Sequence, residues 1–355
     1  MTPELGIIEG FFGQPYSWEE RADMVRALAP AGYGFYLYAP KADAILRRRW
    51  REPYPESDLE ALGAFAQVCR DAGVRFGVGL SPYELFLGFD APAKAALSAK
   101  LDQLDSLGLA DLGVFFDDMK GDLPELAERQ VEIVHWIAER TTASRVIACP
   151  SYYTDDPVLD RVFGQRPANY LEDLGAGLDP AVELMWTGEE VCAKEFSPGH
   201  LARVAEQMRR RPFLWDNYPV NDGPRMSRHL HLRAFTGRPA AIGPHIAAHG
   251  VNTASQAVLS RIPALTLAES YAKGESYEYL AAFRTACQAV LGPDLADGVE
   301  RTLLLLEDAG LDGMTAEQKT RLTTRFGAFD HPAAREILAW LDGAFAIGAE
   351  ELQTQ

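Results

Sequence analysis

The chain has 355 residues, of which 47% are hydrophobic and 24% charged, and its formal net charge is -17 at pH 7. This length and apolar content can fill one large core, with room for a modest additional region. The acidic balance disfavours a nucleic acid or an anionic membrane surface as a partner, because both would be repelled.

Segments for export or membrane insertion are not evident in the sequence. No stretch approaches the roughly 18 consecutive apolar residues of a membrane helix, and the opening MTPELGIIEG has neither the basic nor the apolar part of a secretion signal. The cysteines Cys69, Cys149, Cys192 and Cys287 are far apart and form no C-x-x-C pair. We therefore expect a soluble, cytoplasmic protein with reduced thiols.

Up to about residue 270, short apolar runs alternate with longer stretches of helical periodicity. Helices are expected between the runs. Ser17 and Glu20 have the spacing of a capping box at the first helix, and the next helix is predicted to begin at Ser57 or Asp58 and to end before Gly73. The candidate strands are 5–12, 34–40, 75–82, 110–118, 145–153, 182–188, 212–219 and 240–247.

Strands that alternate with crossover helices predict a parallel sheet, and eight such units match the size of a (β/α)8 barrel. Counting strands leaves a doubly wound open sheet as the alternative. Toward the end of the chain, the segments 275–292, 294–310 and 331–352 have helical periodicity instead. The predicted fold is α/β, with a (β/α)8 TIM barrel over 1–272, followed by a small C-terminal helical region over 273–355 that packs against it.

The predicted carboxyl ends of the strands are rich in acids, amides, Tyr and Trp, in segments such as YAPKAD, FFDDMK, CPSYYTD and WDNYPVND. In a barrel of this kind the loops after the strands form the functional face. A polar, aromatic mouth without a glycine-rich phosphate loop favours a neutral polyhydroxy ligand such as a carbohydrate. The alternative is that these loop ends are polar only because they face water.

The adjacent Asp117 and Asp118 follow an apolar run directly. Repulsion and partial burial should raise one of the two pKa values and leave the other carboxylate ionised, which supplies an acid and an anion near neutral pH. The alternative is a structural one, with the two aspartates at the start of a helix as N-cap and first-turn acid. Asn217, Asn221 and Asp222 could likewise serve only in Asx turns.

Four histidines raise the possibility of a metal site. His229 and His231 alternate, and His245 and His249 have the i, i+4 spacing of two ligands on one helix. However, residues 229–231 are predicted to be helical, where i and i+2 diverge, and 245–249 spans a predicted strand end. We predict neither a metal nor a cofactor, with a metal-dependent hydrolase as a weaker alternative.

Several motifs, in order from residue 5 to about residue 270, resemble glycoside hydrolase family 84, the β-N-acetylglucosaminidases that include the O-GlcNAcases. They are GIIEGFFGQPYSWEER, YLYAPKAD, WREPYPESD, FFDDM, CPSYY, ELMWTG and WDNYPVND. The resemblance implies a (β/α)8 barrel and retaining exo-hydrolysis of β-linked GlcNAc. The 2-acetamido group of the substrate, rather than an enzyme nucleophile, would attack the anomeric carbon and form an oxazoline.

The resemblance also implies roles for individual residues. Asp117 would orient and polarise the acetamido group, and Asp118 would act first as acid and then as base. Tyr153 and Asn217 would hold the acetamido group and Asp117, while Trp215 would line the acetyl pocket. The sugar hydroxyls would be bound by the main-chain carbonyl of Gly10 and by the side chains of Lys41, Asp222 and Asn252.

Three positions depart from the family pattern. Ala42 stands where an acid usually follows the lysine, Phe12 where a tyrosine is common, and Tyr152 where a glutamate is usual. These departures leave a catalytically weak GlcNAc-binding protein as the alternative function. The expected partner is a glycoside or glycoprotein that contains β-GlcNAc, and the position of the C-terminal helices, similar to that of dimerising helices in the family, suggests a homodimer.

Overall fold

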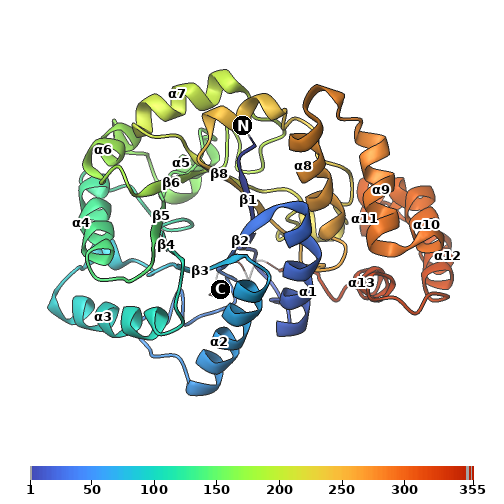
Figure 1. Cartoon of the computed structure of the whole chain (residues 1–355), viewed down its shortest axis with the longest axis horizontal. Helices are drawn as coiled ribbons and strands as arrows, with labels where there is room; N and C mark the ends of the chain where they lie inside the picture. Colours follow the sequence, from blue (N-terminus) through green and yellow to red (C-terminus); the bar gives the residue numbers. More distant parts are fainter. Residues whose placement is uncertain (1, 349–351, 353) are drawn as a thin grey trace.

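The computed structural model describes residues 2–348, 352, 354 and 355. Eight parallel strands form a closed barrel in chain order, and helices surround it (Figure 1). The predicted (β/α)8 barrel is therefore confirmed, and the open-sheet alternative is wrong. The strands are β1 Glu4–Glu9, β2 Tyr33–Tyr38, β3 Arg75–Leu80, β4 Asp111–Phe115, β5 Arg145–Cys149, β6 Glu183–Trp186, β7 Phe213–Asp216 and β8 Ala248–Asn252.

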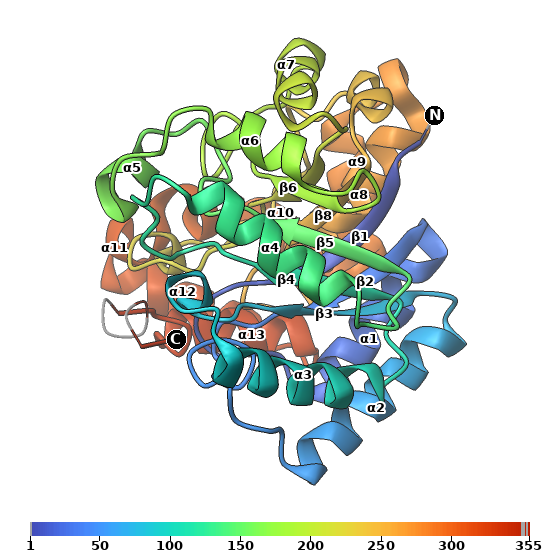
Figure 2. The ribbon, with the colours of Figure 1, turned by 90° about the vertical axis from the view of Figure 1, so that its left-hand side faces the viewer.

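The helices of the barrel are α1 Trp18–Leu28, α2 Glu56–Asp71, α3 Ala91–Asp105, α4 Leu126–Ala138, α5 Val158–Phe163, α6 Tyr170–Gly177, α7 Pro198–Met208 and α8 Arg261–Lys273. Figure 2 shows several of them along the outside of the strands. None of the described helices is long and apolar enough to cross a membrane.

The capping signal predicted for the first helix is confirmed, whereas the predicted start of the second helix is wrong. The predicted capping box is present, since the Ser17 side chain accepts from the Glu20 amide and the Glu20 side chain accepts from the Ser17 amide. The predicted start of α2 at Ser57 or Asp58 is wrong. Pro55 already has an extended backbone (φ -58°, ψ 149°), so the helix begins directly after it, whereas Gly73 follows the helix with φ +70° as expected.

The eighth strand differs from its prediction. Residues 240–247, predicted to be a strand, instead contain a 3-10 helix over Ala240–His245, and β8 is formed by the next residues. Pro244 lies inside the predicted run and has no amide hydrogen to donate to a ladder. The observed strand contains His249 and Asn252. These two side chains are polar, and hydrogen bonds compensate for their burial.

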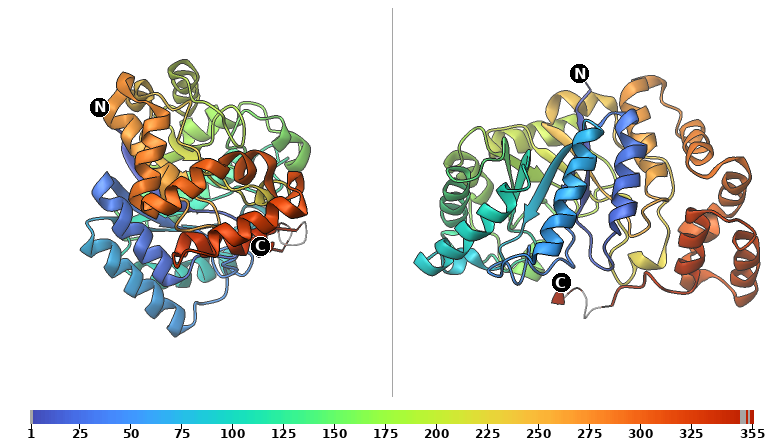
Figure 3. Two further views of the ribbon diagram at one scale, coloured as in Figure 1. Left: turned by 90° about the vertical axis from the view of Figure 1, so that its right-hand side faces the viewer. Right: turned by 60° about the horizontal axis from the view of Figure 1, so that its bottom comes forward.

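Beyond the barrel lie α9 Tyr279–Leu291, α10 Pro293–Leu303, a π-helical turn over Leu304–Ala309, α11 Gly310–Gly313, α12 Ala316–Phe326 and α13 Pro332–Leu341. Figure 3 shows them gathered on one side of the barrel. The helix predicted over 331–352 ends at Leu341, and residues 349–351 of that prediction lie outside the described residues. The helix α12 was not predicted at all.

The helical region packs against the barrel, as expected. Glu336 of α13 accepts hydrogen bonds from the amides of Val258 and Leu259 at 2.7 and 3.0 Å, and Trp340 donates to the carbonyl of Ser227. A second apolar cluster joins α9–α13 to residues 230–234 of the loop after β7 and to residues 258–262 around the start of α8. The boundary between residues 272 and 273 falls at the end of α8 and stays a prediction.

A buried ion pair secures the end of β1. Both carboxylate oxygens of Glu9 accept hydrogen bonds from Arg21 of α1, at 2.7 and 2.8 Å, and Tyr36 and the amide of Tyr16 also donate to Glu9. The side chains of Glu9 and Arg21 are 0% and 4% exposed. The pair therefore fixes the chain immediately before the loop that begins at Gly10.

Replacing Arg21 with Met should lower the free energy of unfolding by about 3 kcal/mol, because Glu9 would be left buried without its cation. Urea denaturation measures this loss. Arg301→Met is the matched control, since Arg301 pairs with Asp297 at the surface, where the two side chains are 69% and 58% exposed, and it should have no measurable effect. Equal losses in the two variants would contradict the prediction.

Candidate active site

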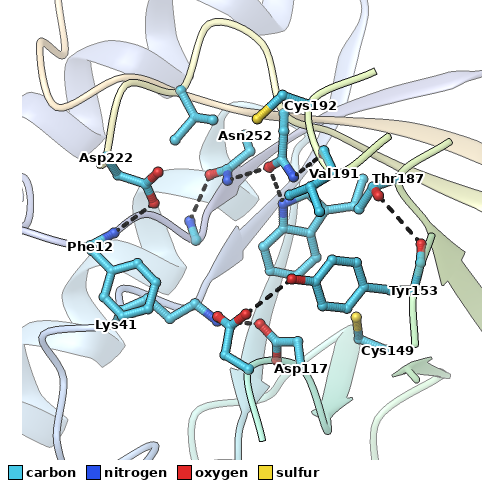
Figure 4. Close-up of a pocket in the computed structure, with 15 residues that line it drawn as sticks. Phe12, Lys41, Asp117, Cys149, Tyr153, Thr187, Val191, Cys192, Asp222 and Asn252 are labelled. Carbon is cyan, nitrogen blue, oxygen red and sulfur yellow. Dashed lines mark hydrogen bonds and ion pairs between the residues drawn. The ribbon is translucent and has the colours of Figure 1, made fainter. Parts of the chain in front are cut away.

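A pocket opens where the carboxyl ends of the strands meet (Figure 4). Residues from widely separated parts of the sequence contribute to it because the barrel brings the loops after its strands to one face. The structure brings together every residue that the sequence predicted for the site, namely Gly10, Lys41, Asp117, Asp118, Tyr153, Trp215, Asn217, Asp222 and Asn252.

The two adjacent aspartates follow the end of β4. Phe115, the last residue of the strand, packs edge-on against the Trp215 ring, with ring centroids 5.3 Å apart. Asp117 lies two residues further along the chain and lines the pocket. Asp118 has φ +56°, a conformation that an aspartate adopts at a cost in strain. This turn lets neighbouring carboxylates face the same volume.

The structural alternative for these aspartates, the start of a helix, is wrong. The next helix, α4, begins at Leu126, and Glu125 is its N-cap. Neither Asp117 nor Asp118 therefore caps a helix.

Lys41 binds both carboxylates. Its ammonium group contacts Asp117 directly and lies 3.2 Å from Asp118 Oδ2. Burial alone would raise the pKa of Asp118, but the ammonium of Lys41 and, next, the guanidinium of Arg47 outweigh burial and lower this pKa. Asp118 therefore fits the member of the pair that was expected to stay ionised, rather than the one with the raised pKa.

Tyr153 donates from its hydroxyl to Asp118 Oδ1 at 3.0 Å. This contact differs from the expectation that Tyr153 holds Asp117. Burial, followed by the charge of Asp118, keeps the pKa of Tyr153 well above its ordinary value, so the phenol stays a hydrogen-bond donor. Cys149 lies beside it on the pocket wall (Figure 4), and burial raises the pKa of this thiol as well.

A chain of neutral hydrogen bonds forms the opposite wall. Asn217 Oδ1 accepts from Trp215 Nε1 at 3.0 Å and from Asn252 Nδ2 at 2.8 Å, and Asn252 Oδ1 accepts from the Gly10 amide at 3.2 Å. A β-carbon on Gly10 would come within 2.4 Å of the Trp215 ring. Glycine is therefore required at position 10. The predicted contact between Asn217 and Asp117 is replaced by these bonds and one from Asn217 to the Val191 carbonyl.

Two further aspartates near this wall have opposite pKa shifts. Burial raises the pKa of Asp222 to about 6, although the amide of Phe12 donates to it at 3.0 Å. Burial would also raise the pKa of Asp216, but the Arg238 guanidinium, which binds both of its oxygens, outweighs burial and lowers that pKa. The difference follows from a direct ion pair, which Asp216 makes with Arg238 and which Asp222 does not make with any described residue.

Three of the four candidate histidines are hydrogen-bonded elsewhere. His249 lies between Asp216 and Tyr271 in the buried interior, while His229 and His231 contact main-chain carbonyls. Residues 229–231 follow a 3-10 turn and are not helical, so that prediction is wrong. No group of three or more His, Cys, Asp or Glu side chains suited to a metal ion occurs among residues 2–348, 352, 354 and 355.

Sequence reasoning missed several residues at the site. Thr187, Val191 and Cys192, from the loop after β6, line the pocket. The signal was present, since this loop follows the polar strand end MWTGEE. The contact of Arg47 with the Asp118 carbonyl, at 3.4 Å, has no sequence signal.

Comparison with known proteins gives consistent matches. A family model described as beta-N-acetylglucosaminidase matches residues 5–304. The chain is 31% identical over 254 residues to Protein O-GlcNAcase of Mus musculus and of Rattus norvegicus. These matches cover 68% of this chain but 27% of either relative, so the chain spans about a quarter of their length.

A solved structure extends the comparison to nearly the whole chain. It is a mutant of the O-GlcNAc hydrolase of Thermobaculum terrenum, with a TM-score of 0.78 and 26% sequence identity. The match covers 95% of this chain and 80% of that one.

Asp222→Asn should change how stability depends on pH. Because the folded pKa, about 6, exceeds the unfolded value of about 4, the folded state binds this proton more tightly, and stability falls as the pH rises from about 4 to about 6. The variant has no carboxyl group at this position and lacks this loss. Its free energy of unfolding relative to that of wild type should therefore be about 2 kcal/mol higher at pH 7 than at pH 4. Urea denaturation at both pH values measures the difference, and an unchanged difference would contradict the raised pKa.

Proposed function

The chain belongs to the beta-N-acetylglucosaminidase family of glycoside hydrolases, and from this premise we propose that it hydrolyses terminal β-linked GlcNAc with participation of the substrate's own acetamido group. The observation that carries the proposal is the pair Asp117 and Asp118 in one pocket, opposite a wall built from Trp215 and amide side chains. A pyranose ring with an N-acetyl group offers the polar edges and apolar face that such a pocket binds.

In the first step, Asp117 accepts a hydrogen bond from the acetamido N–H, which increases the electron density on the acetamido oxygen. That oxygen attacks the anomeric carbon as the bond to the leaving oxygen breaks, and Asp118 gives its proton to the leaving oxygen. In the second step, water attacks the anomeric carbon of the oxazoline, which keeps its proton on nitrogen and is hydrogen-bonded to Asp117, and passes a proton to Asp118. The bond to the acetamido oxygen breaks, and configuration at the anomeric carbon is retained overall.

Lys41 has to change partners for this cycle to run. In the structure its ammonium lowers the pKa of Asp118, which favours the carboxylate over the acid. In the proposed complex Lys41 donates to a sugar hydroxyl instead. Withdrawal of the cation raises the pKa of Asp118, so that substrate binding itself prepares the acid.

The remaining wall would bind the sugar ring. We assign the hydroxyl contacts to the Gly10 carbonyl, Lys41, Asp222 and Asn252, and the acetamido contacts to Tyr153 and Asn217 with Trp215. The hydrogen bonds that join Gly10, Asn252, Asn217 and Trp215 support this assignment, because they fix these groups before substrate arrives.

The cellular location, the oligomeric state and the natural substrate are proposals as well. Four free cysteines, three of them buried, are compatible with the expected cytoplasmic location. A homodimer through the C-terminal helical region and a glycoprotein substrate are further proposals. A GlcNAc-binding protein without turnover is the second candidate, favoured only by the departures at positions 12, 42 and 152.

Asp117→Asn and Asp118→Asn should each reduce hydrolysis of β-N-acetylglucosaminides about 100-fold or more. The two losses should differ in pattern. Asp118→Asn should affect an alkyl glycoside more than a nitrophenyl glycoside, because a good leaving group needs less protonation, whereas Asp117→Asn should affect both equally. Steady-state kinetics with both substrates measures this.

Asp122→Asn is the matched control, since Asp122 is an exposed acid on the same loop, paired only loosely with Lys120 at 3.8 Å. It should retain activity. Binding of an oxazoline mimic by wild-type protein that hydrolyses neither substrate would instead identify a sugar-binding protein.

Lys41→Met tests the charge coupling. Loss of the ammonium should raise the pKa of Asp118 in the free protein, so the protonated acid persists to higher pH. The alkaline limb of the pH dependence of kcat/KM should then move upward, together with a lower overall rate from the lost sugar contact. An alkaline limb at the wild-type pH would contradict the coupling.

A further inference from the structure

Residues 229–233, in the long loop after β7, pack against the π-helical turn at Leu304–Ala309, and we call them the bridging segment. The amides of Leu232 and Arg233 donate to the same oxygen of Glu307, Oε2, at 3.1 and 3.0 Å. The Glu307 side chain is 10% exposed, and its other oxygen lies 3.5 Å from the Arg233 guanidinium. A largely buried carboxylate of the helical region thus holds the main chain of a barrel loop.

Further contacts join the same two elements. The Leu230 amide donates to the Leu306 carbonyl at 3.0 Å, and the His229 ring donates from Nδ1 to the Glu307 carbonyl at 2.7 Å. A β-carbon on Gly310, which follows the turn with φ +61°, would come within 2.6 Å of the His229 ring. Glycine is therefore required where the turn approaches the bridging segment.

The bridging segment also holds the residues that lead to Asp222. The His229 carbonyl accepts from Asn221 Nδ2 at 3.0 Å, and the His231 ring donates from Nδ1 to the Val220 carbonyl at 2.9 Å. Asn221 is 1% exposed and directly precedes Asp222. The segment therefore connects the helical region to a residue of the pocket.

Asp222 depends on this support more than Asn217, which lies earlier in the same loop. The Asn217 side chain belongs to the chain of hydrogen bonds on the pocket wall and is fixed by it. The Asp222 carboxylate accepts from the Phe12 amide, but its main chain follows Asn221, which the bridging segment holds. A displaced segment would therefore move Asp222 first.

We propose that Glu307 is a positioning residue, which acts through the bridging segment to hold Asp222 where it binds a sugar hydroxyl. The inference rests on the proposed function, which assigns this contact to Asp222, and it gives the helical region a part in sugar recognition. Without the Glu307 oxygen, the amides of Leu232 and Arg233 lose their acceptor. The segment then moves toward other partners, and Asn221 and Asp222 move with it.

Glu307→Leu removes the acceptor. Its kcat/KM for a nitrophenyl β-N-acetylglucosaminide should fall about 10-fold, which corresponds to the loss of one hydrogen bond between a carboxylate and a sugar hydroxyl. The fall should come mainly from a higher KM, because this contact binds substrate and transition state alike. Glu307→Gln should stay within about 2-fold of wild type, since a single oxygen accepts both amides and glutamine retains one.

Asp222→Ala supplies a readout that a general loss of structure would not change. In this background, which lacks the carboxylate, Glu307→Leu should change kcat/KM by less than about 2-fold. A similar large loss in both backgrounds would mean that Glu307 supports the fold without positioning Asp222. An unchanged kcat/KM in the single variant Glu307→Leu would mean that the loop needs no support. Either result overturns the inference.

His229→Leu carries the same test if Glu307→Leu does not fold. It removes the contact from the ring to the Glu307 carbonyl and leaves the two amides bound. It should lower kcat/KM in the wild-type background but not in the Asp222→Ala background. Equal losses in the two backgrounds would overturn the inference.

Asp308→Leu is the matched control. Asp308 is the next residue of the same turn, and it pairs with Arg233 at the surface, where the two side chains are 50% and 37% exposed. Its kcat/KM should equal that of wild type, because an exposed pair contributes little. A loss as large as that of Glu307→Leu would assign the effect to the turn as a whole and contradict the role of Glu307.

Binding of the thiazoline analogue of the oxazoline separates this inference from the proposed function. Its Kd, measured by calorimetry, should rise about 10-fold in Glu307→Leu. Wild-type protein that binds the analogue without hydrolysing the glycoside would overturn the proposed function alone. Equal Kd values for wild type and Glu307→Leu would overturn the positioning role alone, and wild-type protein that neither binds nor hydrolyses would overturn both.

Discussion

Pairing between β1 and β8 is the constraint on which the site depends. The two strands run in register from Glu4 with Ala248 to Ile8 with Asn252, and this pairing closes the barrel. Closure brings Gly10, near the start of the chain, to Asn252, and their hydrogen bond continues through Asn217 to Trp215. A shift of one residue would turn Asn252 away from the pocket and break this chain of bonds.

The positions of a few cations determine the charge of the carboxylates around the pocket. Lys41 serves two carboxylates, so the group of Lys41, Asp117 and Asp118 has a net negative charge when both acids are ionised. In the proposed reaction positive charge develops near the anomeric carbon, and a fixed negative environment stabilises it. Asp222, which forms no ion pair with a described residue, keeps its proton to a higher pH than Asp216, which Arg238 binds.

Local signals predicted much of this architecture, while partners distant in sequence could not be predicted. The capping box at Ser17 and the glycine after α2 depend only on residues a few positions away, so the sequence alone reveals them. The eighth strand was predicted in the wrong place because β8 contains the buried, polar His249. Its hydrogen-bond partners Asp216 and Tyr271 come close to it only in the folded barrel. For the same reason, the strand ends indicated residues that line one pocket but did not reveal that Lys41 lowers the pKa of Asp118.

The three departures from the family pattern differ in their relation to the pocket. Tyr152 is 0% exposed, donates to the Gly164 carbonyl and packs on Tyr170, so it supports the loop without lining the site.

Ala42 does not line the pocket, and the neighbouring Asp43 accepts hydrogen bonds from Tyr38 and Tyr54, which anchor the segment that carries Lys41. Only Phe12 faces the pocket, where its amide holds Asp222 and its ring lies 5.6 Å from the Lys41 ammonium. A ring without a hydroxyl keeps both contacts. The departures therefore leave the proposed catalytic groups in place, which favours a hydrolase over a protein that only binds the sugar.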